Sequence, residues 1–155
     1  MSGLRIEGWD EKYAEDFISL SVEWLEMYVS VEPIDLQILN NPHKYILDGG
    51  GEIFFALFDD VVVGTVAMIN QGDNKYELAK LCVTPKYKGL KIGEALINAC
   101  FNFAKSRGAC SIELFTNSAL IPAIGLYKKM GFVEKAIESN KYQEADMLMA
   151  ITLQA

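Results

Sequence analysis

The sequence predicts a mixed α/β fold in which a central, mostly antiparallel sheet carries helices on both faces. Three observations lead to this prediction. The 155 residues are 51% hydrophobic, which is enough for the core of one domain. Short apolar runs typical of strands alternate with longer stretches of helical periodicity. Two of the strand-like runs are joined by two acidic residues only, as in an antiparallel hairpin.

The first half of the chain is expected to hold a strand, two helices and this hairpin. Asp10 is a good N-cap for the first helix, and Pro33 fits the first position of the second. Asp59-Asp60 forms the hairpin turn. In chain order, the predictions are a strand over 4–9, helices over 10–28 and 33–39, a helical turn over 43–48, and strands over 52–58 and 61–70.

The second half is expected to alternate strands and helices after a polar loop over 71–75. The apolar spacing from Ile92 onward is that of a helix lying on a core, and Gly108 is placed to end it. Gly131 similarly ends a later helix. In chain order, the predictions are a strand over 76–83, a helix over 92–107, a strand over 111–116, a helix over 119–130, and strands over 132–137 and 147–153.

Composition argues against several classes of function. With 14 Lys plus Arg against 21 Asp plus Glu, the formal net charge is −7, and such a protein is a poor general binder of nucleic acid. The three cysteines contain no Cys-x-x-Cys pair and His43 is the sole histidine, so we expect no metal site. No apolar run approaches membrane-spanning length and the first residues lack a signal-peptide core, so we expect a cytoplasmic protein that does not bind membranes.

A lysine-rich loop follows the predicted strand over 76–83. Lys86, Lys88 and Lys91 crowd the start of the next helix, where Asp or Glu would be usual because a helix N-terminus is already positive. Four lysines lie between Lys80 and Lys91 with no acidic residue among them. The pattern favours a bound polyanion at the helix start, and a solvated lysine loop is the alternative.

Two motifs resemble those of the GNAT superfamily of N-acetyltransferases. Val83–Pro85 (VTP) and Lys88–Gly93 (KGLKIG) are similar to the family's Val-x-Pro followed by Arg/Gln-x-x-Gly-x-Gly/Ala. Leu126–Phe132 (LYKKMGF) is similar to the family's Leu-Tyr-x-x-x-Gly-Phe. The order of elements also matches over nearly the whole chain, which implies one GNAT domain over residues 1–155.

Two positions depart from the family pattern. Lys88 replaces the usual Arg or Gln and would reach a phosphate as a point charge. Lys91 replaces a glycine. If that position needs a positive φ, the lysine costs stability; with a helical φ, the lysine adds positive charge and its backbone N–H still donates.

The resemblance implies acetyl-CoA as the acyl donor and no metal. The family's strand bulge would place the backbone of Leu81, Cys82 and Val83 against the pantetheine arm, with one N–H polarising the thioester carbonyl. Asn117 would bind the pantetheine or cap the next helix, and Lys129 would assist the phosphates or simply lie exposed. The pyrophosphate would bind the backbone of Lys88, Gly89, Leu90, Lys91, Ile92, Gly93 and Glu94.

Two residues are candidates for the proton transfers. An alkylammonium acceptor has a pKa near roughly 10 and must lose a proton before it attacks. Glu77 begins the strand that leads into the loop, where the family often places a carboxylate, and it is the expected base. The alternative is that Glu77 is an ordinary exposed glutamate. Glu52 is a weaker candidate for the base. Tyr127 occupies the family's tyrosine position and is expected to protonate the CoA thiolate, with core packing as the alternative.

The expected activity is direct transfer of the acetyl group to a primary amine of a small molecule, peptide or protein in a ternary complex. The acceptor would lie near Trp24, Tyr28, Tyr45 and Tyr142, although packing explains each aromatic residue equally well. The net negative charge mildly favours a cationic amine. A non-catalytic acyl-CoA sensor and an interaction domain of the same fold are the alternatives, and an exposed edge strand would allow a homodimer.

Overall fold

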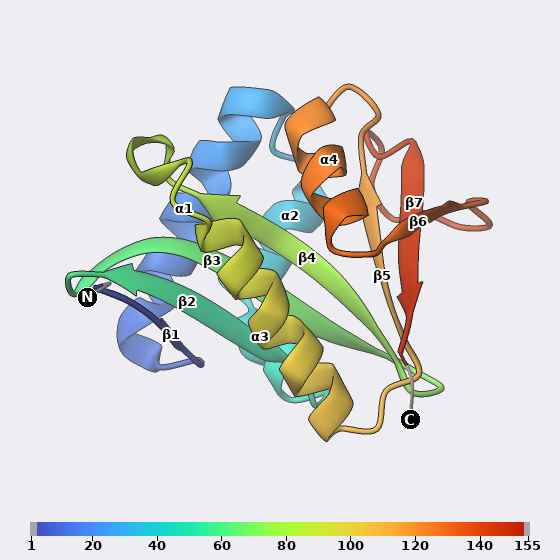
Figure 1. Cartoon of the computed structure of the whole chain (residues 1–155), viewed down its shortest axis with the longest axis horizontal. Helices are drawn as coiled ribbons and strands as arrows, with labels where there is room; N and C mark the ends of the chain where they lie inside the picture. Colours follow the sequence, from blue (N-terminus) through green and yellow to red (C-terminus); the bar gives the residue numbers. More distant parts are fainter. Residues whose placement is uncertain (1–2, 154–155) are drawn as a thin grey trace.

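A computed structural model of the chain describes residues 3–153 and contains seven strands and four α-helices in these residues (Figure 1). A 3-10 turn at Glu11–Tyr13 precedes the first helix, another at Pro85–Tyr87 precedes the third, and a π-helical turn covers His43–Leu47. The helices are α1 (Ala14–Tyr28), α2 (Pro33–Asn40), α3 (Ile92–Ser106) and α4 (Ile121–Lys129). The strands are β1 (Leu4–Glu7), β2 (Glu52–Phe58), β3 (Val61–Gly72), β4 (Lys75–Val83), β5 (Ser111–Thr116), β6 (Val133–Lys135) and β7 (Met147–Thr152).

The strands form one sheet in the order β1-β2-β3-β4-β5-β7-β6. All neighbouring pairs are antiparallel except β4 and β5, which are parallel. The mixed, mostly antiparallel fold expected from the sequence is therefore confirmed. Within residues 3–153, no helix combines the length and the apolar character needed to cross a membrane.

Two hairpins connect β2, β3 and β4, and each turns on two residues with positive φ. These are Asp59 (49°) with Asp60 (68°), and Asp73 (53°) with Asn74 (60°). Such turns match the twist of the flanking strands, and Asp and Asn tolerate the left-handed region better than most residues. The prediction of a polar loop over 71–75 was wrong at its edges, because β3 extends to Gly72 and β4 already begins at Lys75.

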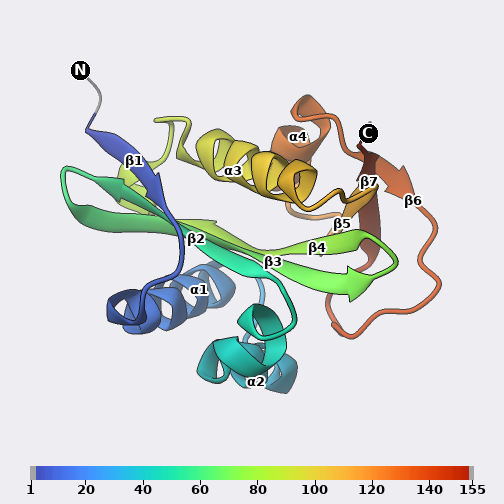
Figure 2. The same ribbon diagram turned by 90° about the horizontal axis from the view of Figure 1, so that it is seen from below.

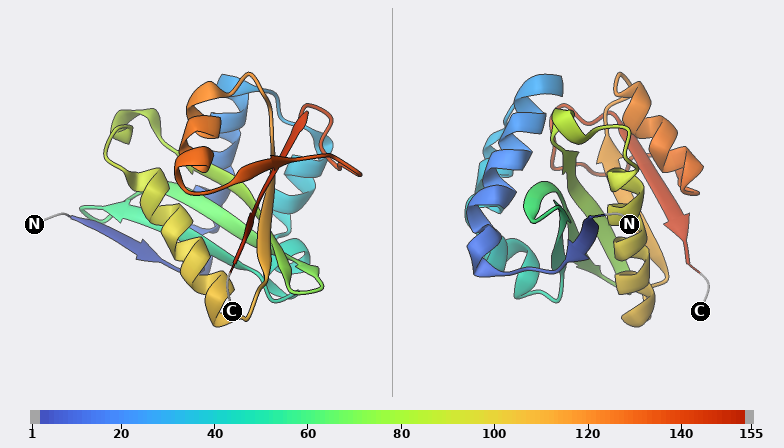
Figure 3. Two further views of the ribbon diagram at one scale, coloured as in Figure 1. Left: turned by 45° about the vertical axis from the view of Figure 1, so that its right-hand side comes forward. Right: turned by 60° about the vertical axis from the view of Figure 1, so that its left-hand side comes forward.

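The helices divide between the two faces of the sheet, with α1 and α2 on one side and α3 and α4 on the other (Figures 2 and 3). Under α3, the buried residues Leu96 and Ile97 pack in the same core as Met68 of β3. On the opposite face, Phe17 and Ile38 pack in a second core with Phe55 of β2. Each fully buried large apolar side chain contributes about 1.5–3 kcal/mol, so both layers hold the sheet rigidly in place.

The sheet opens between β4 and β5. These two strands pair only from Lys75 to Glu77, opposite Ser111 to Glu113, and then separate (Figure 1). Beyond Glu77, β4 also carries a bulge: Thr65 faces Cys82 and Ala67 faces Ala79, so two residues of β4 lie opposite one residue of β3. The result is a wedge-shaped gap beside an unpaired edge of β4, where the sequence predicted the pantetheine arm.

Candidate active site

Two pockets meet at this gap. The inner pocket lies between α1, the start of α2 and β4, and its lining includes Glu32, Asp35, Glu77 and Tyr142. The loop pocket lies between the lysine-rich loop, the start of α3, and α4. The two pockets share a wall formed by Trp24, Leu81, Cys82, Leu120 and Tyr127. A molecule that filled both pockets would therefore pass beside the β4 bulge.

The loop pocket contains most of the residues predicted to hold a pyrophosphate. Leu90 is the exception, because it is half exposed and outside the lining. The first N–H groups of α3 have no partner within the helix and are free to receive an anion. Gly93 lets α3 and α4 approach closely, since a Cβ there would lie 3.0 Å from Leu126. The residues predicted for the pyrophosphate that line the pocket are Lys88, Gly89, Lys91, Ile92, Gly93 and Glu94; Lys129 from α4 and Val83, predicted for the pantetheine arm, line it too.

The positive charge of the loop pocket comes from a different set of lysines than the sequence suggested. Lys88 contacts the Tyr28 hydroxyl and lies 4.6 Å from the ring centroid. Lys129 Nζ lies 3.0 Å from Glu94 Oε2. Lys80, in contrast, forms a buried ion pair with Asp35 on the α2 side of the sheet. The predicted cluster of four lysines is therefore wrong at Lys80, which neutralises a carboxylate of the inner pocket, and Lys86 also lies outside the lining of the loop pocket.

Lys91 has a left-handed backbone, with φ 61° and ψ 26°, at the N-cap of α3. Its side chain makes no capping hydrogen bond. A non-glycine residue in this region costs about 1–2 kcal/mol, because its Cβ crowds the backbone. Of the two alternatives for Lys91, the structure thus supports the strained one.

Replacing Lys91 with Gly is expected to raise the free energy of unfolding by about 0.5–1 kcal/mol, since the relieved strain exceeds the extra unfolded-state entropy of glycine. Urea denaturation without ligand measures the change. Lys88→Gly is the matched control, because Lys88 has φ −64° and gains nothing from glycine. A loss of stability in both variants would contradict the strain at Lys91.

Tyr127 lies at the junction of the two pockets. Its ring is buried against Phe132, with the centroids 6.0 Å apart. Across residues 3–153, no side chain or backbone group hydrogen-bonds the Tyr127 hydroxyl, and no fully buried side-chain oxygen or nitrogen is left without a partner. The hydroxyl is therefore open to the pocket. Burial raises the pKa of the phenol, so it carries its proton at neutral pH.

Glu77 lies in the inner pocket with 1% of its side chain exposed. Its Oε2 accepts a hydrogen bond from the Tyr142 hydroxyl at 3.0 Å, and its Oε1 pairs with the ammonium group of Lys141. The alternative reading of Glu77 as an ordinary exposed glutamate is wrong. Glu52 lies outside both pockets, where it accepts hydrogen bonds from the backbone N–H groups of Trp9 (3.2 Å) and Ile53 (2.9 Å).

The comparisons with known proteins agree with this geometry. Residues 13–132 match the family model described as the acetyltransferase (GNAT) family. The chain belongs to this family. An uncharacterized N-acetyltransferase of Schizosaccharomyces pombe is 30% identical over 122 residues, which cover 76% of this chain and 75% of that protein. Two other curated relatives are much longer, and the matches span 27% and 42% of their lengths.

Solved GNAT structures share the fold across the chain. A GNAT acetyltransferase of Staphylococcus aureus superposes with a TM-score of 0.89 at 24% identity, covering 97% of this chain and 99% of that chain. The PaiA N-acetyltransferase of Thermoplasma acidophilum, solved in complex with coenzyme A, has a TM-score of 0.75 at 19% identity and covers 99% of this chain and 100% of that chain. At sequence identities of 24% and 19%, the similarity to these two structures shows the fold alone.

Two further residues of the GNAT site have constrained roles. Burial raises the pKa of the Cys82 thiol to about 12, so at neutral pH this residue is not a thiolate nucleophile. Asn117 lines the inner pocket, and both ends of its amide are in use: Nδ2 donates to the Glu144 carbonyl at 2.5 Å and Oδ1 accepts from the Ala119 N–H at 2.9 Å. The amide thus orders the turn before α4, and its contact with a cofactor stays a prediction.

Among the aromatic residues expected near the acceptor, Trp24 and Tyr142 line the inner pocket and Tyr28 lines the loop pocket. Tyr45 lies in neither and packs against the core under α1 and α2. The expectation of Tyr45 near the acceptor finds no support in this geometry.

Sequence reasoning missed the polar network behind the GNAT inner pocket. Glu32 and Asp35 form a capping box at the start of α2, and the Glu32 carboxylate also accepts hydrogen bonds from the N–H groups of Gln143 (2.7 Å) and Glu144 (3.2 Å). The three-residue spacing of Glu32 and Asp35 is that of a capping box, although Glu and Asp are not its usual residue types, so this spacing is the available signal. Lys141 offers no such signal, because it lies 64 residues from Glu77 in the chain.

Proposed function

We propose that this GNAT protein transfers the acetyl group of acetyl-CoA to a primary amine by direct attack in a ternary complex. The observation that carries the proposal is the meeting of two chemically different pockets at Tyr127. One pocket ends at a lysine-flanked helix start, which suits phosphates, and the other contains the buried carboxylate of Glu77. The acyl group would pass between them.

The residues of the loop pocket fit the donor. The free N–H groups at the start of α3 and the ammonium groups of Lys88, Lys91 and Lys129 would bind the diphosphate. Gly89 has φ 82°, which lets the loop turn without a side chain over the anion. The unpaired edge of β4 beyond Glu77 offers backbone groups to the amides of the pantetheine arm.

The chain's own groups supply the proton transfers. Glu77 removes a proton from the acceptor ammonium, and the neutral nitrogen attacks the thioester carbonyl. A backbone N–H at the bulge stabilises the developing oxyanion, which is worth about 3 kcal/mol for a well-aimed donor. As the C–N bond forms and the C–S bond breaks, the Tyr127 hydroxyl protonates the departing thiolate. The second proton of the acceptor nitrogen restores the Tyr127 hydroxyl, so one N–H remains on the amide and the net proton released is the one taken up by Glu77. The buried Cys82 thiol makes an acetyl-cysteine intermediate unfavourable, which supports direct attack.

The test combines titration calorimetry of acetyl-CoA with a thiol-release assay over a panel of amines, amino acids and lysine peptides. We expect binding, together with transfer to at least one primary amine. Tight binding with no transfer to any acceptor would instead indicate a non-catalytic acyl-CoA sensor. Absence of binding would overturn the proposal altogether, since the folded loop pocket would then serve another purpose.

A further inference from the structure

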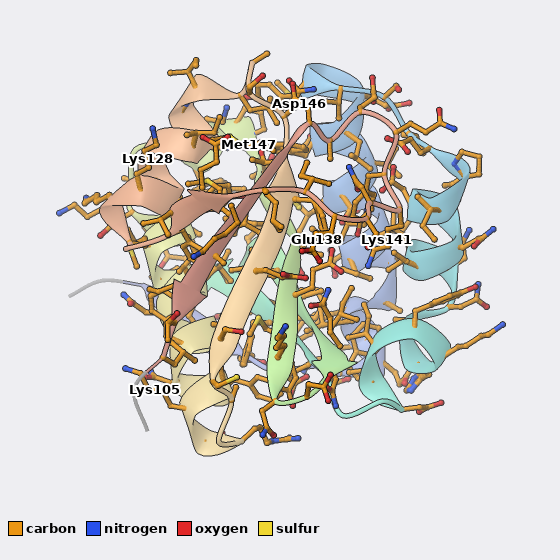
Figure 4. All side chains as sticks on the ribbon, turned by 90° about the vertical axis from the view of Figure 1, so that its right-hand side faces the viewer. Lys105, Lys128, Glu138, Lys141, Asp146 and Met147 are labelled. Atoms are coloured by element: carbon orange, nitrogen blue, oxygen red, sulfur yellow. The ribbon has the colours of Figure 1, made fainter. Side chains whose placement is uncertain are left out.

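The carboxylate that would deprotonate the acceptor already holds a primary ammonium group. Lys141 Nζ pairs with Oε1 of Glu77, which lines the inner pocket, although Lys141 itself is not part of that lining. Lys141 belongs to the segment 136–146 between β6 and β7, which passes beside α1 and α2 (Figure 4). The place beside Oε1, where an acceptor nitrogen would have to lie for direct proton transfer, is therefore filled by an amine of the protein itself.

The two side-chain donors on Glu77 differ in how firmly they are held. Tyr142 is anchored, because its ring lies 6.0 Å from Phe115 and 5.3 Å from the Lys80 ammonium group. Lys141 has 37% of its side chain exposed, against 1% for Glu77, and lies outside the pocket lining; its ammonium group also lies 5.2 Å from the Tyr142 ring centroid. Lys141 is thus the exchangeable donor.

The backbone beyond Lys141 is fixed independently of the lysine. Glu32 accepts the N–H groups of Gln143 and Glu144, and the Glu144 carboxylate accepts hydrogen bonds from the N–H (2.9 Å) and hydroxyl (2.8 Å) groups of Ser30. The segment is therefore held beside the pocket by contacts that do not depend on the Lys141 side chain.

The other carboxylates of the inner pocket are already committed. Asp35 is paired with the buried Lys80, and Glu32 and Glu144 hold the hydrogen bonds just described. An acceptor that displaces Lys141 without bringing its own positive charge would leave the buried Glu77 carboxylate unpaired, which is costly. The lining of the inner pocket also includes the apolar residues Trp24, Leu25 and Val29, which suit a methylene chain.

We propose that Lys141 takes the place of the acceptor's ammonium group on the Glu77 carboxylate, and that the acceptor is a primary ammonium group on an unbranched alkyl chain, which displaces Lys141 from Glu77. A lysine side chain of a peptide and a free alkyldiamine share this chemistry. The inference rests on the proposed function, because it takes the inner pocket as the acceptor's site.

The test is titration calorimetry on the protein saturated with CoA, which carries no acetyl group to transfer. The probes are 1,5-diaminopentane, a peptide with one internal lysine and a blocked N-terminus, and aniline, which is neutral at pH 7. Lys141→Gln keeps the approximate length without the charge, and Lys141→Arg keeps the charge. Lys135→Gln, at an exposed lysine of β6, is the matched control.

Lys141→Gln should bind at least one alkylammonium probe at least about fivefold more tightly than the wild type. The reason is that the apparent Kd falls as the fraction of protein whose Glu77 carboxylate is not paired with Lys141 rises. The probe that gains shows which source of the alkylammonium group the site accepts. Lys135→Gln should match the wild type, Lys141→Arg should bind no more tightly than the wild type, and aniline should gain nothing in any variant.

Unchanged or weaker binding of the alkylammonium probes by Lys141→Gln would overturn the inference. An equal gain in affinity for aniline would also overturn it, because the gain would then come from the smaller side chain and not from the loss of a competing ammonium group. Acetyl-transfer assays with the same probes separate this inference from the proposed function. Tighter binding without transfer would refute only the proposed function, whereas transfer without tighter binding would refute only the role of Lys141.

Discussion

Replacing Glu77 with Gln is expected to lower kcat/KM for an alkylamine acceptor about a thousandfold at neutral pH, within the range for loss of a positioned general base. The amide has nearly the same shape and still accepts a hydrogen bond from Tyr142, but it does not take a proton. Steady-state kinetics with saturating acetyl-CoA measures the loss, and calorimetry should show acetyl-CoA binding unchanged.

The pH dependence identifies the cause of that loss. Without a base, only the neutral fraction of the acceptor reacts, and this fraction rises tenfold per pH unit below the amine's own pKa of about 10.4. The variant should therefore gain about tenfold per unit between pH 7 and 9, whereas the wild type should rise less steeply. The control is Glu113→Gln on the facing residue of β5, which lies outside both pockets. Equal losses in the two variants would remove Glu77 from the mechanism.

Tyr127→Phe is expected to lower kcat about a hundredfold, since it removes one hydroxyl that would protonate the leaving thiolate. The ring packing against Phe132 is retained, so acetyl-CoA should bind with an unchanged Kd. A thiol-release assay gives kcat, and calorimetry gives the Kd.

The matched control for this variant is Tyr76→Phe. Tyr76 is a buried tyrosine whose hydroxyl donates to the Gly50 carbonyl at 3.3 Å, away from both pockets. It should lose about 1 kcal/mol of stability and keep its turnover. If Tyr127→Phe shows wild-type kcat, the hydroxyl is not the proton donor and Tyr127 serves only to pack the core.

Local patterns in the sequence predict the elements well, because each pattern reports a nearby physical constraint. The apolar stripe of α3 and the glycine that follows it define the helix, and Asp59-Asp60 marks a turn. The same reasoning fails at Asp73-Asn74, where polar residues look like a loop although they form a two-residue turn between long strands.

The site is less predictable because its parts come together only through the fold. The bulge, with Lys80 at φ 58°, places this lysine on the α2 side of the sheet, and alternation along a strand does not reveal such a shift. The burial of Glu77 depends on the segment carrying Lys141 and Tyr142, far away in the sequence. The lysine-rich loop, in contrast, could be predicted as an anion site from the sequence, because the end of a strand, the glycines and the start of a helix follow one another there.

The buried ion pair between Lys80 and Asp35 joins the β4 bulge directly to α2. Anyone redesigning acceptor preference would find that substitutions around Asp35 also move the strand on which the thioester would lie, so specificity and rate would change together. Removing one partner alone would leave a buried charge uncompensated, at a cost of about 3–5 kcal/mol. Variation is safer at Leu25 and Val29, which line the inner pocket but not the loop pocket and, as apolar residues, hold no charged partner.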